Sequence, residues 1–190
     1  MAATLTDWLR TLRGRLPESE TDADLLRRFG TDRDEEAFAE LVARHGPMVF
    51  GVCRRVLGHG PDAEDAFQAV FVILAVKADT GVGKVGAWLH GVAFRVARKA
   101  LSRRFRRNSD SSDLLDQIHS RDDRHDPDAD HLREKLDEVI AGLPEKYRAA
   151  VVLCELEQVS RADAAGRLGW TEGTLSGRLA RARKLHAAPG

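Results

Sequence analysis

Apolar residues recur at spacings of three and four along most of this chain, a period that predicts α-helices. From Asp34 onward the pattern defines one face of a helix of several turns, with positions Phe38, Leu41, Val42, His45, Val49, Val52, Cys53, Val56 and Leu57. Almost no segment alternates apolar and polar residues, and aromatic residues make up only 6% of the chain. Because strands normally show that alternation, the predicted fold class is all-α.

The first half of the chain is predicted to form a four-helix domain over residues 21–107. A short helix at 24–29 comes before the long one, which Gly46-Pro47 could bend or interrupt. The segment from Gly58 to Pro61 ends this helix and starts another at about 62–78, and the fourth spans about 87–107. Residues 1–20 form an N-terminal extension of unknown role, with Leu5, Trp8, Leu9 and Leu12 at helical spacing.

The charges of the chain cancel only in total. It has 30 basic and 30 acidic residues, which alone would argue against nucleic-acid binding. By segment, however, the net charge is −4 over 21–80, +8 over 81–107, −8 over 108–145 and +4 over 146–190. Residues 108–130 are rich in Ser, Asp and His, and they predict an acidic, flexible, mostly extended linker between two domains. Charge blocks of this size call for separate binding roles.

A helix-turn-helix is predicted within a second domain over residues 131–187. One helix starts at His131 and breaks at 142–144, and the next begins near Pro144. Ser160 and Asp163 have the spacing of a capping box for a helix over 161–168, which Gly169 would end. Thr171 would then cap a last helix over about 172–186. Two short helices joined by a tight turn are typical of this DNA-binding motif.

The last helix separates its residues into two faces. Leu175, Leu179, Ala182 and Leu185 form an apolar stripe, and the opposite side carries Thr174, Gly177, Arg178 and Arg181, extended by Arg183 and Lys184. Taken alone, this division fits a solvated amphipathic helix as well as a helix that reads the major groove. Combined with the short capped helix before it, it favours DNA binding.

The +8 block contains no acidic residue, although exposed helices normally gain from pairs of opposite charge. Its basic residues alternate with aromatic ones, a combination that suits unstacked, single-stranded bases. Trp88 by itself is more typical of a core. The residues concerned are Trp88, His90, Phe94, Arg95, Arg98, Lys99, Arg103, Arg104, Phe105, Arg106 and Arg107.

Four stretches together resemble one family, the extracytoplasmic-function sigma factors of bacterial RNA polymerase. Residues 62–71 (DAEDAFQAVF) are similar to the polymerase-binding helix of the family, and 87–99 (AWLHGVAFRVARK) to its promoter-melting helix. Residues 143–148 (LPEKYR) and 173–183 (GTLSGRLARAR) are similar to the domain that reads the upstream promoter element. The sequence of residues 88–97 (WLHGVAFRVA) also resembles that of a subgroup common in planctomycetes. The resemblance covers residues 21–186 and implies a two-domain, sigma-2-like and sigma-4-like architecture.

The resemblance implies a role for each segment. Asp62, Glu64, Asp65, Phe67, Gln68 and Phe71 would bind the clamp helices of the largest polymerase subunit. The downstream promoter element and the opened strand would contact Trp88, His90, Phe94, Arg95, Arg98, Lys99, Arg103 and Arg104. The upstream element would contact Thr171, Thr174, Ser176, Gly177, Arg178, Arg181, Arg183 and Lys184. The linker would pass through the interior of the polymerase, the second domain would sit on its flap, and an anti-sigma factor would be the expected inhibitor.

Two departures from the family pattern concern glycines. Ser176-Gly177 stands where many members have a Lys-Ser pair, which removes one cation and weakens the helix by roughly 1 kcal/mol. Gly166 also stands where a larger side chain is common. Promoter affinity of the isolated second domain is therefore expected to be low.

Other classes of function are weaker predictions. A stand-alone helix-turn-helix regulator would explain the last helices but leave residues 62–71 and the acidic linker without a role. Nucleophile and HExxH spacings are absent from the sequence, so neither an enzyme nor a metal or other cofactor is expected. Cys53 and Cys154 fit buried thiols. No apolar run is long enough to span a bilayer and no signal peptide is recognisable, so we expect no membrane insertion and a cytoplasmic location.

Overall fold

A computed structural model describes residues 20–109 and 127–187, and every regular element in these ranges is helical. The N-terminal elements are α2 (Asp22–Asp32), α3 (Glu35–Leu57), α4 (Pro61–Lys77), the short 3-10 helix η1 (Ala78–Thr80) and α5 (Val85–Ser109). The C-terminal elements are α6 (Pro127–Gly142), α7 (Glu145–Val151), the π-helical segment η2 (Val152–Leu156), α8 (Arg161–Leu168) and α9 (Glu172–Ala187). The all-α prediction is confirmed. The predicted N-terminal extension lies outside the described residues, except for Glu20.

Side-chain caps explain where the first helices begin. The hydroxyl of Thr21 accepts a hydrogen bond from the amide of Asp24, and the carboxylate of Asp34 accepts from the amides of Glu36 and Ala37. These contacts satisfy amides that have no partner within the helix. Gly46-Pro47, where a bend or an interruption was expected, does not interrupt the helix, because α3 continues through Pro47. The proline is exposed and residues on both sides of it are buried, so packing on the inner face maintains the helix.

The predicted linker differs from the structure at its end. Residues 127–130, expected to be extended, form the first turn of α6, which therefore begins four residues before His131. Pro127 is the first residue of this helix, a position that proline suits because its fixed φ is already helical. The rest of the predicted linker from residue 110 lies outside the described residues.

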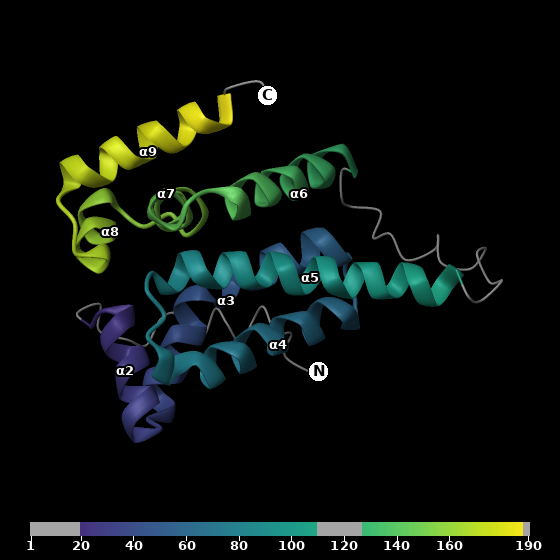
Figure 1. Ribbon diagram of the computed structural model, residues 1–190, viewed down its shortest axis with the longest axis horizontal. Coiled ribbons are helices and arrows are strands. Elements are labelled where there is room, and N and C mark those ends of the chain that lie inside the picture. The colour runs from purple at the N-terminus through teal and green to yellow at the C-terminus, as the bar shows by residue number, and fades with distance from the viewer. Residues whose placement is uncertain (1–19, 110–126, 188–190) are drawn as a thin grey trace, which may run out of the picture.

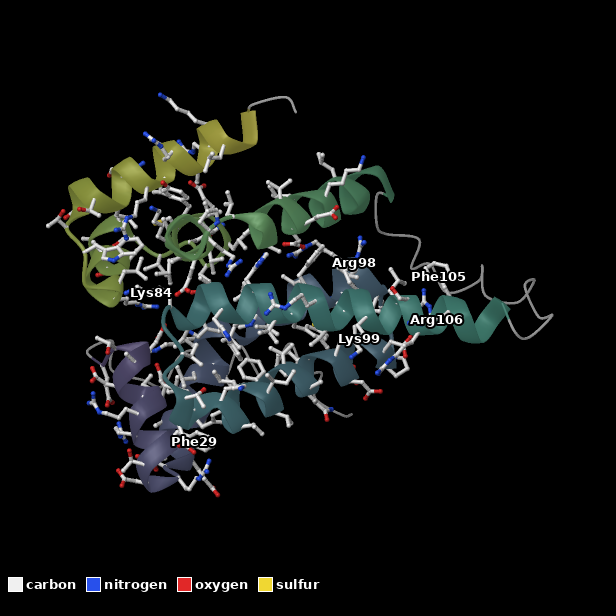
Figure 2. All side chains as sticks on the ribbon, in the orientation of Figure 1. Phe29, Lys84, Arg98, Lys99, Phe105 and Arg106 are labelled. Atoms are coloured by element: carbon white, nitrogen blue, oxygen red, sulfur yellow. The ribbon has the colours of Figure 1, made fainter. Side chains whose placement is uncertain are left out.

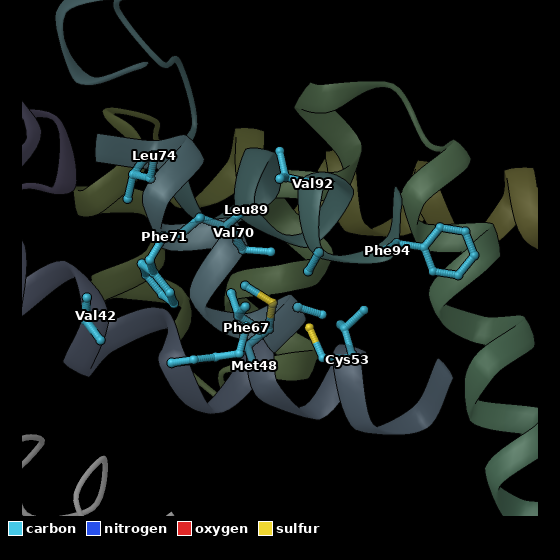
Figure 3. Close-up of a cluster of buried hydrophobic side chains, with 14 of the residues drawn as sticks. Val42, Met48, Cys53, Phe67, Val70, Phe71, Leu74, Leu89, Val92 and Phe94 are labelled. Atoms are coloured by element: carbon cyan, nitrogen blue, oxygen red, sulfur yellow. The ribbon is translucent and has the colours of Figure 1, made fainter. Parts of the chain in front are cut away.

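Three long helices enclose the N-terminal core. Figure 3 shows it, with Phe67, Val70, Phe71 and Leu74 of α4 facing side chains of α3 and α5. The rings of Phe67 and Phe71 lie 5.1 Å apart between centroids, and Leu74 and Val70 are fully buried. This packing gives α5 a rigid support on one side.

The C-terminal helices have a second apolar cluster of their own, formed by Ala149, Ala150, Leu153, Ala164, Ala165, Leu168, Leu175 and Leu179. Half of the predicted capping box is present, since the amide of Asp163 donates to the Ser160 hydroxyl. The Asp163 carboxylate accepts from that same hydroxyl rather than from a backbone amide. Gly169 ends α8 with φ of 64°, the left-handed conformation expected there.

The two halves of the chain pack against each other along α5. Ile140 of α6 and Val152 of η2 belong to the N-terminal core, and Ala87 of α5 belongs to the C-terminal cluster. In Figure 1, α5 lies between α4 on one side and α6 and α7 on the other. One side of α5 is thus covered by the C-terminal half.

Candidate functional site

The outer face of α4 carries the exposed members of the first predicted site. Glu64, Asp65 and Gln68 are exposed, whereas Phe67 and Phe71 are core residues that face α3 and α5. α4 begins at Pro61, and its first turn contains Asp62 and Glu64, near the positive end of the helix dipole, which favours their charge there. The phenylalanines therefore support this face from inside rather than forming part of it.

Two valines extend the same face, and the sequence analysis did not single them out. Val72 and Val76 are 61% and 70% exposed, and they follow Gln68 at intervals of four residues. Residues at this spacing share one side of a helix. Because Ala69–Val76 is an uninterrupted apolar run, its periodicity gave no way to tell exposed valines from buried ones.

One predicted polymerase contact pairs with one predicted DNA contact. The guanidinium of Arg104 lies 3.5 Å from the carboxylate of Asp62, and it also donates to the backbone carbonyl of Leu57 at 3.4 Å. These contacts join α5 to the end of α3 and to the start of α4. Both side chains thus have a structural role in this conformation.

Basic side chains follow the outer side of α5. Arg95, Arg98, Lys99, Arg103 and Arg106 are exposed, and Figure 2 shows Arg98, Lys99, Phe105 and Arg106 along the C-terminal half of the helix. Phe105 is 62% exposed, unlike the half-buried Trp88 and the buried Phe94. Of the three aromatic residues of the block, Phe105 is therefore the one presented at the surface among the cations. Trp88 and Phe94 differ from Phe105 because side chains of neighbouring helices cover them.

His90 and Phe94 are covered by the C-terminal half of the chain. Phe94 lies in the same buried cluster as Ile140 of α6, and Arg98 stacks on its ring at 5.8 Å from the centroid. His90 is fully buried, and its Nε2 lies 3.2 Å from the carboxylate of Asp137. In this arrangement neither side chain is accessible to DNA.

Asp137 on α6 is the centre of a buried polar cluster. It accepts two hydrogen bonds from the Arg55 guanidinium, at 2.6 and 2.9 Å, besides its contact with His90. Burial raises the pKa of Asp137, but the hydrogen bonds from His90 and Arg55 outweigh burial and hold this pKa below its ordinary value. Asp137 therefore carries a negative charge inside the protein, and sequence spacing gave no sign of it.

The predicted recognition helix, α9, presents its polar side outward. Thr174, Gly177, Arg181 and Lys184 are exposed, and Leu175, Leu179 and Ala182 are buried as expected. Leu185 is the exception in the apolar stripe, since it is half exposed. The hydroxyl of Thr171 accepts from the amide of Thr174, as predicted for the cap.

Two arginines of α9 also contact the protein itself. The guanidinium of Arg178 lies 3.8 Å from the centre of the Trp170 ring, and that of Arg183 is 2.8 Å from the Glu155 carboxylate. Stacking on an aromatic ring fixes the orientation of a guanidinium. Trp170 thus positions Arg178 in the middle of α9, beside the exposed Gly177 and Arg181, and sequence spacing gave no sign of this contact.

Within residues 20–109 and 127–187, no group of His, Cys, Asp and Glu side chains has the arrangement of a metal site. Cys53 is buried and Cys154 half-buried, both as free thiols, and burial raises the pKa of Cys53 to about 12. The described helices include none that is both long and apolar enough to cross a membrane.

Two family models and several known proteins match this chain. The family described as Sigma-70 region 2 matches residues 41–110, and Sigma-70, region 4 matches residues 133–185. The ECF RNA polymerase sigma factor SigM of Mycobacterium tuberculosis is 30% identical over 86% of this chain and 81% of its own length. SigE of Mycolicibacterium smegmatis, another ECF RNA polymerase sigma factor, is 29% identical over 76% of this chain, which spans 58% of that protein.

A solved structure is also similar in part. It is described as a co-crystal structure of the sigma factor RpoE with the anti-sigma factor NepR from Bartonella quintana. It is 21% identical, with a TM-score of 0.37 over 83% of this chain and 99% of that chain. The two matched regions, in order along one chain, and the likeness to SigM over most of both proteins show that this protein belongs to the ECF RNA polymerase sigma factors, which direct RNA polymerase to promoters.

Proposed function

We propose that this sigma factor binds its partners through three separate surfaces, one on each of α4, α5 and α9. The observation that carries the proposal is their separation. Acidic and apolar side chains are exposed on α4, and exposed cations occupy α5 and α9. A sigma factor needs one surface for a protein partner and others for polyanionic DNA.

The polymerase-binding surface consists of the exposed α4 residues Glu64, Asp65, Gln68, Val72 and Val76. Its partner is the clamp-helix coiled coil of the largest polymerase subunit. Carboxylates would orient the encounter with a basic partner, while the two valines would supply apolar area to bury. Asp62 contributes through its pair with Arg104, and Phe67 and Phe71 support the surface from the core.

The promoter-melting surface lies on α5. Arg95, Arg98, Lys99 and Arg103 would hold the phosphates of the opened strand, with a nontemplate base flipped out beside the domain. The exposed ring of Phe105 is a stacking platform among these cations. No chemical step is required, because the protein opens DNA by binding the open form better than the closed one.

The upstream-element surface lies on α9, which would enter the major groove. Thr171, Thr174, Ser176 and Gly177 form the end nearest the bases, and Arg178, Arg181, Arg183 and Lys184 provide the cations. The domain that carries α9, residues 131–187, would rest on the polymerase flap.

Run-off transcription with core polymerase tests the proposal directly. The added protein should make polymerase start at defined positions on a promoter from the native genome. If the protein instead binds duplex DNA equally well without polymerase and changes no start site, it acts as a stand-alone regulator and the proposal is wrong.

Two sets of variants test which surface does what. Reversing charge in E64K and D65K should weaken polymerase binding, with E35K and E36K as matched controls on exposed carboxylates of α3. R178A and R181A should weaken promoter binding and leave polymerase binding intact. Equal loss of both activities from either set would show that the surfaces are misassigned.

We further propose that the protein acts in the cytoplasm, where the polymerase is, and that an anti-sigma factor inhibits it, as is common in the family. The proposal that this protein belongs to a planctomycete subgroup rests on the sequence of residues 88–97 alone. Co-purification from the native host tests the inhibitor, since a stable partner would appear with the sigma factor. Isolation of polymerase alone would argue against such a partner.

A further inference from the structure

Two clusters of charged side chains join the N-terminal helices to the C-terminal ones. The first is centred on His45 of α3, which is fully buried. Its Nδ1 lies 2.7 Å from Glu157, just after η2, and its Nε2 lies 2.9 Å from Asp22 of α2. Ionised carboxylates only accept hydrogen bonds, so both ring nitrogens carry a proton and His45 is an imidazolium.

The electrostatic surroundings agree with this geometry. Burial lowers the pKa of His45, but Glu157 and Asp22 outweigh burial and raise the pKa to about 10. Arg44, beside His45 in sequence, forms ion pairs with Asp22 and Glu40. The cluster therefore joins two cations and three carboxylates from α2, α3 and the segment after η2.

The second cluster is the one at Asp137 of α6, which is bound by Arg55 of α3 and His90 of α5. Like the first, it has a buried carboxylate from the C-terminal half and cationic or hydrogen-bonding partners from the N-terminal half. Breaking the contact between the halves would thus separate charges at both places.

The backbone around Glu157 is built to direct its carboxylate inward. The π-helical η2 ends with the Glu157 amide donating to the Val152 carbonyl, and Gln158 has φ of 55°, a left-handed conformation that costs free energy outside glycine. Glu155, two residues earlier, faces outward and pairs with Arg183 within the C-terminal half. π-helical turns and strained residues often mark functional positions.

Close packing accompanies the charges. A Cβ atom placed on Gly86 of α5 would lie 3.1 Å from the His45 ring and 3.6 Å from a methyl group of Val152. Val152 is fully buried. The first charged cluster therefore lies directly against the side of α5 that the C-terminal half covers.

We propose that the His45 and Asp137 clusters form a latch that holds the polymerase-free protein closed and covers the inner face of α5, which includes His90 and Phe94. This inference rests on the proposed role of α5 in holding the opened strand, and on His90 and Phe94 joining its exposed cations in that role once they are uncovered. The exposed cations of α9 lie outside the covered region. The latch thus separates two activities: duplex binding by α9 is available in the closed form, and full strand capture by α5 requires opening.

Buried ion pairs suit such a reversible contact. Their Coulomb attraction is largely offset by the cost of removing the charges from water, so the pairs can be exchanged for solvent at small net cost. Removing one partner, in contrast, leaves the other charge buried without compensation. A single substitution should therefore shift the protein strongly toward the open form.

The test compares E157Q with E155Q in the full chain, without polymerase. Both variants remove one negative charge within the same turn, but only Glu157 contacts His45. Small-angle X-ray scattering should show a larger radius of gyration for E157Q than for E155Q. Fluorescence anisotropy should show E157Q binding a single-stranded oligonucleotide roughly tenfold more tightly, if about one molecule in ten of the unmodified protein is open. Binding of E157Q to the matching duplex should equal that of the unmodified protein, because the latch leaves the cations of α9 exposed.

Equal radii of gyration and equal single-strand affinities for the two variants would overturn the latch. Scattering from the unmodified protein that shows two independently moving halves would overturn it as well, and this measurement does not depend on a variant folding. Far-UV circular dichroism controls for loss of helix in E157Q. Because every readout is taken without polymerase, failure of run-off transcription would overturn the proposed function and leave the latch intact.

Discussion

At the scale of single residues, the most informative side chains are buried and charged. His45, Asp22, Asp137 and Glu157 lie inside the protein, where an unpaired charge would be strongly unfavourable. Each is matched with an opposite charge from another element. Their positions in the sequence look like ordinary members of amphipathic helices, because burial of a charge depends on what packs against it.

Replacing His45 with glutamine should destabilise the protein by about 3–5 kcal/mol, because it leaves the buried carboxylates of Asp22 and Glu157 without a cation between them. Urea unfolding at neutral pH measures this change. A loss below about 1 kcal/mol would mean that Arg44 alone compensates Asp22.

The free energy of unfolding should also depend on pH through His45. The pKa of His45 is raised from 6.5 to about 10, so its contribution is fully present below 6.5 and is lost as the pH rises toward 10. The charged groups that face it are Asp22 of α2 and Glu157, with Arg44 bound to Asp22. The free energy of unfolding should fall over this range in the unmodified protein and fall less in H45Q. Parallel curves for the two proteins would contradict the assignment.

At the scale of elements, α4 departs from its sequence pattern and the pair α8–α9 follows it. Residues 69–76 of α4 are all apolar, yet the face with Val72 and Val76 is exposed. α8 and α9 instead match their predicted caps and turn closely, because Ser160, Gly169 and Thr171 act through local backbone contacts.

Exposed apolar residues on α4 should matter for polymerase binding and not for folding. V72S and V76S together should weaken binding to core polymerase roughly tenfold, since both side chains would be buried on docking. Surface plasmon resonance with immobilised polymerase measures the effect. Unchanged affinity, with helix content preserved, would exclude these valines from the docking surface.

Two glycines of the helix-turn-helix should respond in opposite directions to alanine. Gly166 lies within α8 with open space where a Cβ would be, so G166A should stabilise the protein by about 0.5–1 kcal/mol. Gly169 adopts φ of 64°, so G169A should destabilise it by about 1–2 kcal/mol. Chemical unfolding of the two variants side by side checks both signs, and a shift in the same direction for both would be inconsistent with the α8 geometry.

At the scale of the whole molecule, some of the charges that cancel in the neutral total pair with each other where the two halves of the chain meet. The −8 segment over 108–145 includes Asp137, which binds Arg55 and His90 of the N-terminal half. Part of the charge asymmetry that suggests separate DNA and protein surfaces is therefore used inside the protein itself.

A shared interface also predicts cooperative unfolding. Because Ile140 and Val152 complete the N-terminal core, the unmodified protein should unfold in one calorimetric transition. E157Q should split this transition in two, and E155Q should not. A single, unshifted transition in E157Q would indicate that apolar packing alone couples the halves.

Periodicity and local hydrogen bonds were enough to predict the all-α class, most helix boundaries and the capped helix-turn-helix from the amino-acid sequence. The positions of the basic and acidic segments could also be predicted from it. Which members of each segment are exposed follows instead from how the helices pack against one another. Phe67, Phe71, His90 and Phe94 are buried, whereas Val72, Val76 and Phe105 are at the surface. Exposure, and the charge state of a buried group such as His45, depend on residues far away along the chain, which local sequence patterns do not record.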